Sequence, residues 1–249
     1  MVRKILRPAK KPNFLIRDRD LLQQKREAVA DAAFELFLKE GFHRTTTRDI
    51  ARRAGVSAGA PFTYFKDKED ILFHIVSKEQ DRAGEQLLST LSQRIAEAIR
   101  TGTDPEEVFT TVFTIFLRSV DAMRRFILLA YQETKSLNSE TRQALIARER
   151  CLQALIGEAI RYGAERGRFA SDHIELKAHN IMVLAHAWAV RHWAFAGEME
   201  SIEEYIAFLQ PLVLAMLETG AAVETVKKER RPAAIGGRAA GGEGEVTTK

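Results

Sequence analysis

The sequence predicts an all-α protein with an N-terminal three-helix helix-turn-helix domain followed by a longer C-terminal helical domain. Apolar residues recur three and four positions apart along most of the chain, which is the spacing of one face of an α-helix. Capping residues and glycines separate these stretches, and no stretch alternates apolar and polar residues as a half-buried strand does. The 249 residues, 45% of them hydrophobic, are enough to bury a sizeable core.

The same patterns divide the chain into four regions. Residues 1–22 hold seven lysines and arginines as well as Pro8 and Pro12, and we expect a flexible basic arm. Residues 23–70 are the predicted helix-turn-helix domain, and residues 71–226 are the second helical domain. Residues 227–249 open with a basic run and become rich in glycine and alanine, which predicts a disordered tail.

The first helix is predicted to begin at Gln23. Its apolar face includes Val29, Ala33 and Phe37, and Gly41 stands where a left-handed residue would end it. A second, short helix follows, which either Thr46 or Thr47 would cap.

The next residues have the composition of a tight turn between two closely packed helices. Gly55 permits the sharp turn, Val56 fills the gap between the helices, and Ser57 would cap the helix that follows. The small residues Ala51 and Gly59 let the helix backbones approach at a steep angle, as a helix entering the major groove requires. The residues that we expect to contact bases or phosphates are Thr46, Thr47, Arg48, Ser57, Ala58, Gly59, Ala60, Thr63, Tyr64 and Lys68.

Charge is divided unevenly along the chain. Residues 1–70 hold 16 Lys+Arg against 10 Asp+Glu, a net charge of +6, whereas residues 71–226 hold 16 against 21, a net charge of −5. A basic first quarter on an acidic body indicates that a polyanion would bind at the N-terminal end. Random surface charge is the alternative, so the charge supports the motif but does not replace it.

The C-terminal region is predicted to be helical throughout. One amphipathic helix runs from Asp70 to about Arg100, and Asp104 with Pro105 opens a second one. A third spans about 118–134, and a fourth runs from a cap at Asn138 to a stop at Gly167. Two capping-box patterns open the last helices, and they are Asp172 with Glu175 and Ser201 with Glu204.

At the turn the sequence resembles the TetR family of transcriptional regulators. The first helix and its exit match in Ala32-Ala33-x-x-Leu36-Phe37-x-x-x-Gly41-Phe42-x-x-Thr45-Thr46. The turn matches in Asp49-Ile50-Ala51-x-x-Ala54-Gly55-Val56-Ser57-x-Gly59, and the exit of the recognition helix in Tyr64-Phe65-x-x-Lys68-Glu69-x-Ile71-Leu72. The match covers about residues 25–76.

Two residues depart from the family pattern. Pro61 stands where the family usually has an aliphatic residue, and we expect a locally loosened recognition helix. Phe62 stands where the family usually has a tyrosine, which puts one phosphate contact in doubt.

The resemblance implies a homodimer paired through its last two long helices, bound to double-stranded operator DNA and released by a small hydrophobic effector. It also implies that the effector moves the fourth helix and so changes the spacing of the two recognition helices. The residues predicted to line the effector pocket are Phe109, Phe113, Phe116, Phe126, Tyr131, Asn180, Val183 and His186. At helical spacing such an aromatic set is by default plain core, which stays the alternative.

The effector itself is indicated only by Arg191-His192-Trp193 and the helix after it. This segment is similar to the C-terminal ends of TetR relatives that sense fatty acyl-CoA, although an acidic body does not favour an anionic thioester. His179 and His186 lie two turns apart, about 10 Å along a helix, too far to share a metal ion, so we expect no metal site.

The sequence contains no phosphate loop, zinc-protease motif, cysteine cluster or nucleophile elbow, so we expect no catalytic residue, no cofactor and no enzyme. The alternatives to a ligand-controlled repressor are an all-α enzyme and a DNA-binding architectural protein without ligand input. The single cysteine, Cys151, and the absence of a signal peptide or membrane span predict a cytoplasmic protein.

Overall fold

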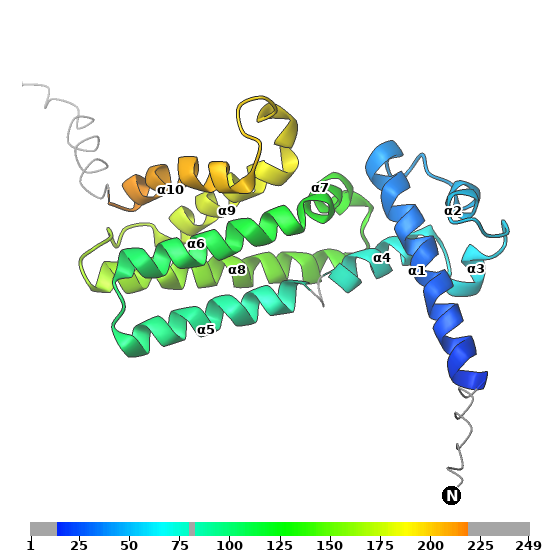
Figure 1. Cartoon of the computed structure of the whole chain (residues 1–249), viewed down its shortest axis with the longest axis horizontal. Helices are drawn as coiled ribbons and strands as arrows, with labels where there is room; N and C mark the ends of the chain where they lie inside the picture. The colour runs from blue at the N-terminus through cyan, green and yellow to red at the C-terminus, as the bar shows by residue number, and fades with distance from the viewer. Residues whose placement is uncertain (1–13, 80–82, 219–249) are drawn as a thin grey trace, which may run out of the picture.

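The computed structural model describes residues 14–79 and 83–218, and within these ranges the chain is helical with no strand. Two helical units lie side by side (Figure 1). The N-terminal unit comprises α1 (Phe14–Glu40), α2 (Thr47–Arg53), α3 (Pro61–Tyr64) and α4 (Lys68–Glu79). The second unit comprises α5 (Glu85–Thr101), α6 (Pro105–Ala122), α7 (Arg124–Glu133), α8 (Ser139–Glu165), α9 (Ile174–Val190) and α10 (Ile202–Glu218). Short 3₁₀ turns follow α7 (η2, Thr134–Ser136) and α9 (η3, His192–Ala194).

The N-terminal unit is built around the apolar face of α1. Val29, Ala33 and Phe37 of α1 are fully buried, and they share a core with Ile50 of α2 and Ile71 of α4. The short α3 has four residues and buries only Pro61, so its position depends on this core.

The second unit is organised around α8, which packs against α5, α6 and α9. The α6 helix carries most of the core, because Phe109, Phe113, Phe116 and Leu117 are all buried. The α10 helix lies over α6 and α9 at the edge of this unit (Figure 1).

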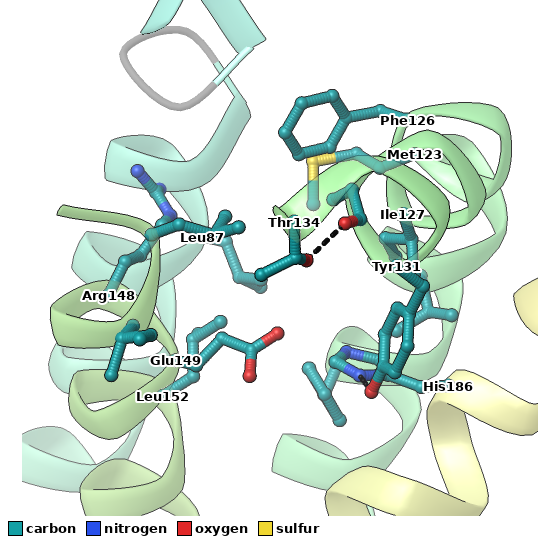
Figure 2. Close-up of a pocket in the computed structure, with 15 residues that line it drawn as sticks. Leu87, Met123, Phe126, Ile127, Tyr131, Thr134, Arg148, Glu149, Leu152 and His186 are labelled. Carbon is teal, nitrogen blue, oxygen red and sulfur yellow. Dashed lines mark hydrogen bonds between the residues drawn. The ribbon is translucent and has the colours of Figure 1, made fainter. Parts of the chain in front are cut away.

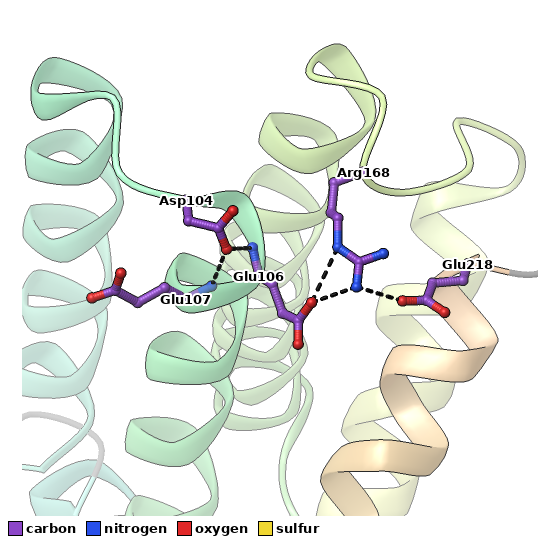
Figure 3. A network of polar contacts seen from close by, with 5 residues as sticks. All are labelled: Asp104, Glu106, Glu107, Arg168 and Glu218. Atoms are coloured by element: carbon purple, nitrogen blue, oxygen red, sulfur yellow. Dashed lines mark hydrogen bonds and ion pairs between the residues drawn. The ribbon is translucent and has the colours of Figure 1, made fainter.

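Ion pairs around Arg168, in the loop between α8 and α9, join three elements at one end of the second unit. Its guanidinium hydrogen-bonds to Glu106 in the first turn of α6 and lies 2.7 Å from the carboxylate of Glu218 at the end of α10 (Figure 3). The Asp104 carboxylate beside this network caps α6, accepting the backbone N–H groups of Glu106 and Glu107 at 3.0 and 3.1 Å. The network holds three elements that are distant in sequence.

Several helix ends lie where the capping residues predicted them. Gly41, directly after α1, and Gly167, two residues after the end of α8, adopt left-handed φ angles of 85° and 74°. Asn138 caps α8 by accepting the N–H of Thr141 at 2.8 Å, and Ser201 accepts the N–H of Glu204 in α10 at 3.3 Å.

Four boundaries differ from the prediction. The first helix begins at Phe14 instead of Gln23, just after Pro12, so an arm could include at most residues 1–13, which lie outside the described residues. The helix predicted over 70–100 is two helices, α4 and α5, and the one predicted over 118–134 is interrupted at Met123.

The fourth difference is at the start of α9, where the Asp172–Glu175 capping box is absent. His173 precedes the helix with a left-handed φ of 50°, and Asp172 pairs with Lys177 at 3.0 Å instead of capping. The predicted tail, residues 227–249, lies outside the described residues. Of the helices that the structure describes, none is long and apolar enough to cross a membrane.

Candidate nucleic-acid interface and ligand cavity

The start of α2 is held by a reciprocal pair of hydrogen bonds. The Thr46 side chain accepts the Asp49 N–H at 3.2 Å, and the Asp49 carboxylate accepts the Thr46 N–H at 3.2 Å. The Thr46 hydroxyl also donates to the Asp49 carboxylate at 2.5 Å, and this hydrogen bond, followed by the one from the Thr46 N–H, holds the pKa of Asp49 below its ordinary value. Of the two threonines predicted as caps, Thr46 is therefore the cap, and α2 has a defined start.

The turn after α2 depends on Gly55. This residue has a φ of 67°, a left-handed conformation that costs other residues about 1–2 kcal/mol. The turn lets the N–H of Val56 reach the carbonyl of Ala51 at 3.0 Å. Val56 then packs against the core, as predicted for the residue between the two helices.

The recognition helix begins differently from the prediction. Ser57 does not cap it with its side chain; its carbonyl accepts the Ala60 N–H at 2.9 Å in a tight turn. The α-helix starts at Pro61, whose missing N–H is not needed in a first turn. Pro61 is also buried, and residues 58–60 form turns in place of the helix start predicted at Ser57, so α3 has only four residues.

Most residues predicted to contact DNA lie on the surface of this unit. The exposed ones are Thr46, Arg48, Ser57, Ala58, Gly59 and Thr63, and the half-buried ones are Thr47, Ala60, Tyr64 and Lys68. Phe62 of α3 is 58% exposed, which makes it an available contact that the sequence analysis discounted.

Lys68 has a structural role that the prediction did not include. Its ammonium donates to the carbonyls of Phe42 and Thr45 at 2.6 and 2.9 Å and lies over the Phe42 ring. It therefore joins α4 to the loop between α1 and α2 and is not directed outward as a free phosphate contact.

A buried carboxylate connects this unit to the second one. Glu133 at the end of α7 accepts the backbone N–H of Phe42 at 3.0 Å and the hydroxyl of Ser136 at 2.9 Å. Nearer the start of α7, Arg125 pairs with Glu35 of α1 at 2.7 Å. The α7 helix therefore contacts α1 at Glu35 and the chain just after α1 at Phe42.

The other side of α7 lines a cavity of about 180 Å³ in the second unit (Figure 2). Its apolar walls come from α5, α6, α7 and α8 and consist of Leu87, Phe116, Val120, Met123, Phe126, Ile127, Ala130, Leu145, Ile146 and Leu152. Apolar walls with a few polar groups are characteristic of small-molecule sites.

The polar residues that line the cavity are Tyr131, Thr134, Arg148, Glu149 and His186. Tyr131 of α7 and Nδ1 of His186 in α9 are 3.0 Å apart, and the Glu149 carboxylate points in from α8 (Figure 2). Burial lowers the pKa of His186 to about 4, so this imidazole is neutral at pH 7. Burial also raises the pKa of Glu149, and burial and then the Glu149 charge raise the pKa of Tyr131.

Comparison with known proteins covers both units. The family model described as bacterial regulatory proteins of the tetR family matches residues 29–75, and a tetracyclin repressor-like C-terminal domain model matches residues 102–217. The HTH-type transcriptional regulator HbdR of Aromatoleum sp. (strain CIB) is 33% identical over 192 residues, covering 77% of this chain and 80% of the relative. The chain belongs to the TetR family of bacterial transcriptional regulators.

Solved structures of TetR-family proteins have the same fold. A tetR-family regulatory protein from Rhodococcus RHA1 aligns with a TM-score of 0.66 at 23% identity, covering 78% of this chain and 97% of that one. FadR from Bacillus subtilis, solved in complex with stearoyl-CoA, aligns with a TM-score of 0.52 at 22% identity, covering 78% and 98%. At this identity the likeness concerns the fold alone.

Half of the predicted pocket residues line the cavity of this TetR-family protein. They are Phe116, Phe126, Tyr131 and His186. Phe109 and Phe113 do not line it, because they stack on each other in the core of α6, with centroids 5.9 Å apart. Asn180 and Val183 do not line it either, because both are exposed on α9.

The α8 helix contributes cavity residues that were not predicted from the sequence. Leu145, Glu149 and Leu152 lie on one face of that helix and form a wall of the cavity. Their spacing of three and four positions was visible in the sequence, but it could not distinguish a wall from core.

We predict that Gly55→Val abolishes specific DNA binding, because a β-branched residue cannot hold the left-handed conformation that directs α3. Gly102→Val is the matched control, since Gly102 has a similar left-handed φ of 68° and open space around an added Cβ but lies at the end of α5, away from the predicted DNA contacts. Fluorescence anisotropy with operator DNA measures the loss, and analytical ultracentrifugation follows the assembly state. Unchanged operator affinity in Gly55→Val would contradict the placement of the turn.

We also predict a pH dependence of stability from His186. Its pKa is about 4 in the folded state against an ordinary value of 6.5, so its stabilising contribution is complete above pH 6.5 and is lost as the pH falls toward 4. The difference corresponds to about 3 kcal/mol. In His186→Asn, which keeps an acceptor for Tyr131, the free energy of unfolding should fall less between pH 6.5 and 4. Parallel curves from urea unfolding would refute this.

Proposed function

We propose that this TetR-family protein is a ligand-responsive repressor that binds a palindromic operator as a homodimer and is released by a small hydrophobic effector. Its proposed DNA contacts are the exposed residues around α2 and α3, with Tyr64 and Phe62 beside them. Such a regulator acts where the chromosome is, in the bacterial cytoplasm, and needs no catalytic group. The alternative is a constitutive architectural DNA-binding protein.

The observation that carries this proposal is the position of α7. One side of this helix supplies Phe126, Ile127, Ala130 and Tyr131 to the cavity. Its last residue, Glu133, holds the backbone of Phe42 at the exit of α1. A molecule that enters the cavity and displaces α7 would therefore shift the DNA-binding unit, which a purely architectural protein would not require.

Exposed apolar side chains on the last two helices support the homodimer. Leu176, Val183 and Leu184 on α9 and Phe208 and Leu212 on α10 are between 38% and 57% exposed. Their spacing along each helix is that of one face, and the opposite face of α9 is buried. A second copy paired on this face would cover them, and it would place two recognition helices for two half-sites.

The groups in the cavity support an effector with an apolar body and an uncharged polar group. The neutral Tyr131–His186 pair offers hydrogen bonds to such a group, and Arg148 and Glu149 of α8 add one cation and one carboxyl group to the lining. A fatty acyl thioester satisfies both conditions, with its charged part outside. A B. subtilis relative of this fold was solved with stearoyl-CoA, and the B. subtilis fatty acid metabolism regulator protein is 28% identical over 127 residues.

We predict that Phe208→Glu dissociates the dimer. Burying this carboxylate twice across a two-fold interface without a partner costs several kcal/mol, so the dimer dissociation constant should rise about 100-fold or more. Ile99→Glu on α5 is the control, because Ile99 is also a large exposed apolar residue but lies on neither helix. Sedimentation equilibrium measures both variants, and an intact Phe208→Glu dimer would exclude this interface.

We further predict that acyl-CoA thioesters release the protein from an operator selected from random DNA. Hexanoyl-, dodecanoyl- and stearoyl-CoA are titrated against the complex, with the corresponding free acids beside them. Val120→Phe should fill part of the cavity and reduce release at least about tenfold while operator affinity is kept. Ile99→Phe, outside the cavity, is the control and should respond as the wild type does.

Each outcome of this titration distinguishes the candidates. Release by a thioester, lost in Val120→Phe alone, supports the repressor and the cavity together. Specific binding that neither thioesters nor acids relieve favours the architectural alternative, and failure to select any operator contradicts both.

A further inference from the structure

The N-terminal part of α1 forms a groove with the recognition helix that the turn motif does not include. Arg19, Leu22, Gln23 and Arg26 of α1 line one side of it, together with Asp20, and Thr63 and Tyr64 of α3 line the other. The α1 helix extends well past α3 at this end of the molecule (Figure 1). The groove is therefore continuous with the proposed DNA-contacting surface.

The groove has the chemistry of an anion site. Arg19 and Arg26 lie seven positions apart, on one face of α1 about 10 Å apart along its axis, and Asp20 is the one acidic residue that lines the groove. Hydroxyl groups on Thr63 and Tyr64 stand opposite them. Arginine guanidinium groups and side-chain hydroxyls are both common contacts of DNA phosphates.

Arg26 packs against an aromatic ring, and its buried Nε has no carboxylate partner among the described residues. Its guanidinium lies 5.0 Å from the centroid of the Phe65 ring, and Nε has no hydrogen-bond acceptor among the described residues. The nearby carboxylate of Glu27 instead contacts Lys78 and His74 of α4. The contact with the Phe65 ring therefore fixes the guanidinium of Arg26 at the groove, whose lining it shares with Tyr64.

The sequence before α1 adds positive charge at the same end. Residues 1–13 include five lysines and arginines and no acidic residue. The two arginines of the groove outnumber its one carboxylate, and the sequence that leads into α1 is basic, so the net charge at this end is complementary to a polyanion.

We propose that the α1–α3 groove binds the phosphate backbone of the DNA that flanks each half-site, with Arg19 and Arg26 as its phosphate contacts. This rests on the proposed operator binding and extends it beyond the helix-turn-helix. The contact is independent of base sequence, so it should increase affinity and salt dependence without changing which operator is preferred.

The experiment measures affinity for the selected operator, and for an unrelated duplex of the same length, over a series of salt concentrations. Arg19→Ala should weaken binding to both duplexes about tenfold, and it should reduce the salt slope by about 0.9 for each lost contact, or nearly 2 per dimer. Lys25→Ala is the matched control, because Lys25 is an exposed cation on the same helix outside the groove. It should change neither quantity by a comparable amount.

A second comparison uses operators of two lengths, one trimmed to the half-sites and one with flanking DNA. The wild type should prefer the longer duplex, and Arg19→Ala and Arg26→Ala should lose that preference. Specific operator binding with equal salt slopes in Arg19→Ala and Lys25→Ala would overturn the groove contact alone. Absence of specific binding in the wild type would instead overturn the operator proposal.

Discussion

The hydrogen bond between the Glu133 carboxylate and the backbone N–H of Phe42 is the contact on which the functional account depends. A buried carboxylate loses its hydration, so it is retained only where donors replace the lost water, and here a main-chain amide and a serine hydroxyl do so. Removing either the Glu133 carboxylate or the donor at Phe42 leaves a buried polar group without its hydrogen-bond partner. The connection between the two units therefore has a defined geometry, which small apolar contacts alone would not impose.

If α7 is displaced, the DNA-binding unit can move with it as one body, because its helices are joined to one another. Lys68 joins α4 to two carbonyls of the loop that Glu133 contacts, and Glu27 of α1 pairs with Lys78 and His74 of α4. The family resemblance implied motion of the fourth helix. In this chain no described residue of α4 lines the cavity, whereas four residues of α7 do. We therefore propose that the route from cavity to DNA runs through α7, with α4 carried along as part of the braced unit.

The sequence predicted the DNA-binding unit well because its signals are local. Gly41, Thr46 and Gly55 act through the conformation of their own few residues, so each can be recognised without knowledge of the fold. The start of α3 was harder to predict from the sequence. Ser57 has the right residue type for a side-chain cap, but the turn uses its backbone carbonyl instead. That choice depends on how Pro61 packs.

The cavity was predicted only in part because its walls come from several helices. His186 was found as a polar residue within an apolar helix, yet Val183 and Asn180 on the same helix face outward. Their orientation depends on which side of α9 meets α7 and α8, which a helical period does not specify. The wall that α8 forms with Leu145, Glu149 and Leu152 was not predicted for the same reason.

The most direct test of the coupling through α7 is the thermodynamic linkage between operator and effector in Glu133→Ala and in the wild type. Isothermal titration with the thioester that releases the wild type, in the free and operator-bound states, gives the coupling factor. In the wild type the account predicts a factor within the usual range of about 5 to 150. In Glu133→Ala it predicts a factor near 1, with thioester affinity for the free protein kept within about threefold. An unchanged coupling factor in a folded, operator-binding Glu133→Ala protein would contradict it.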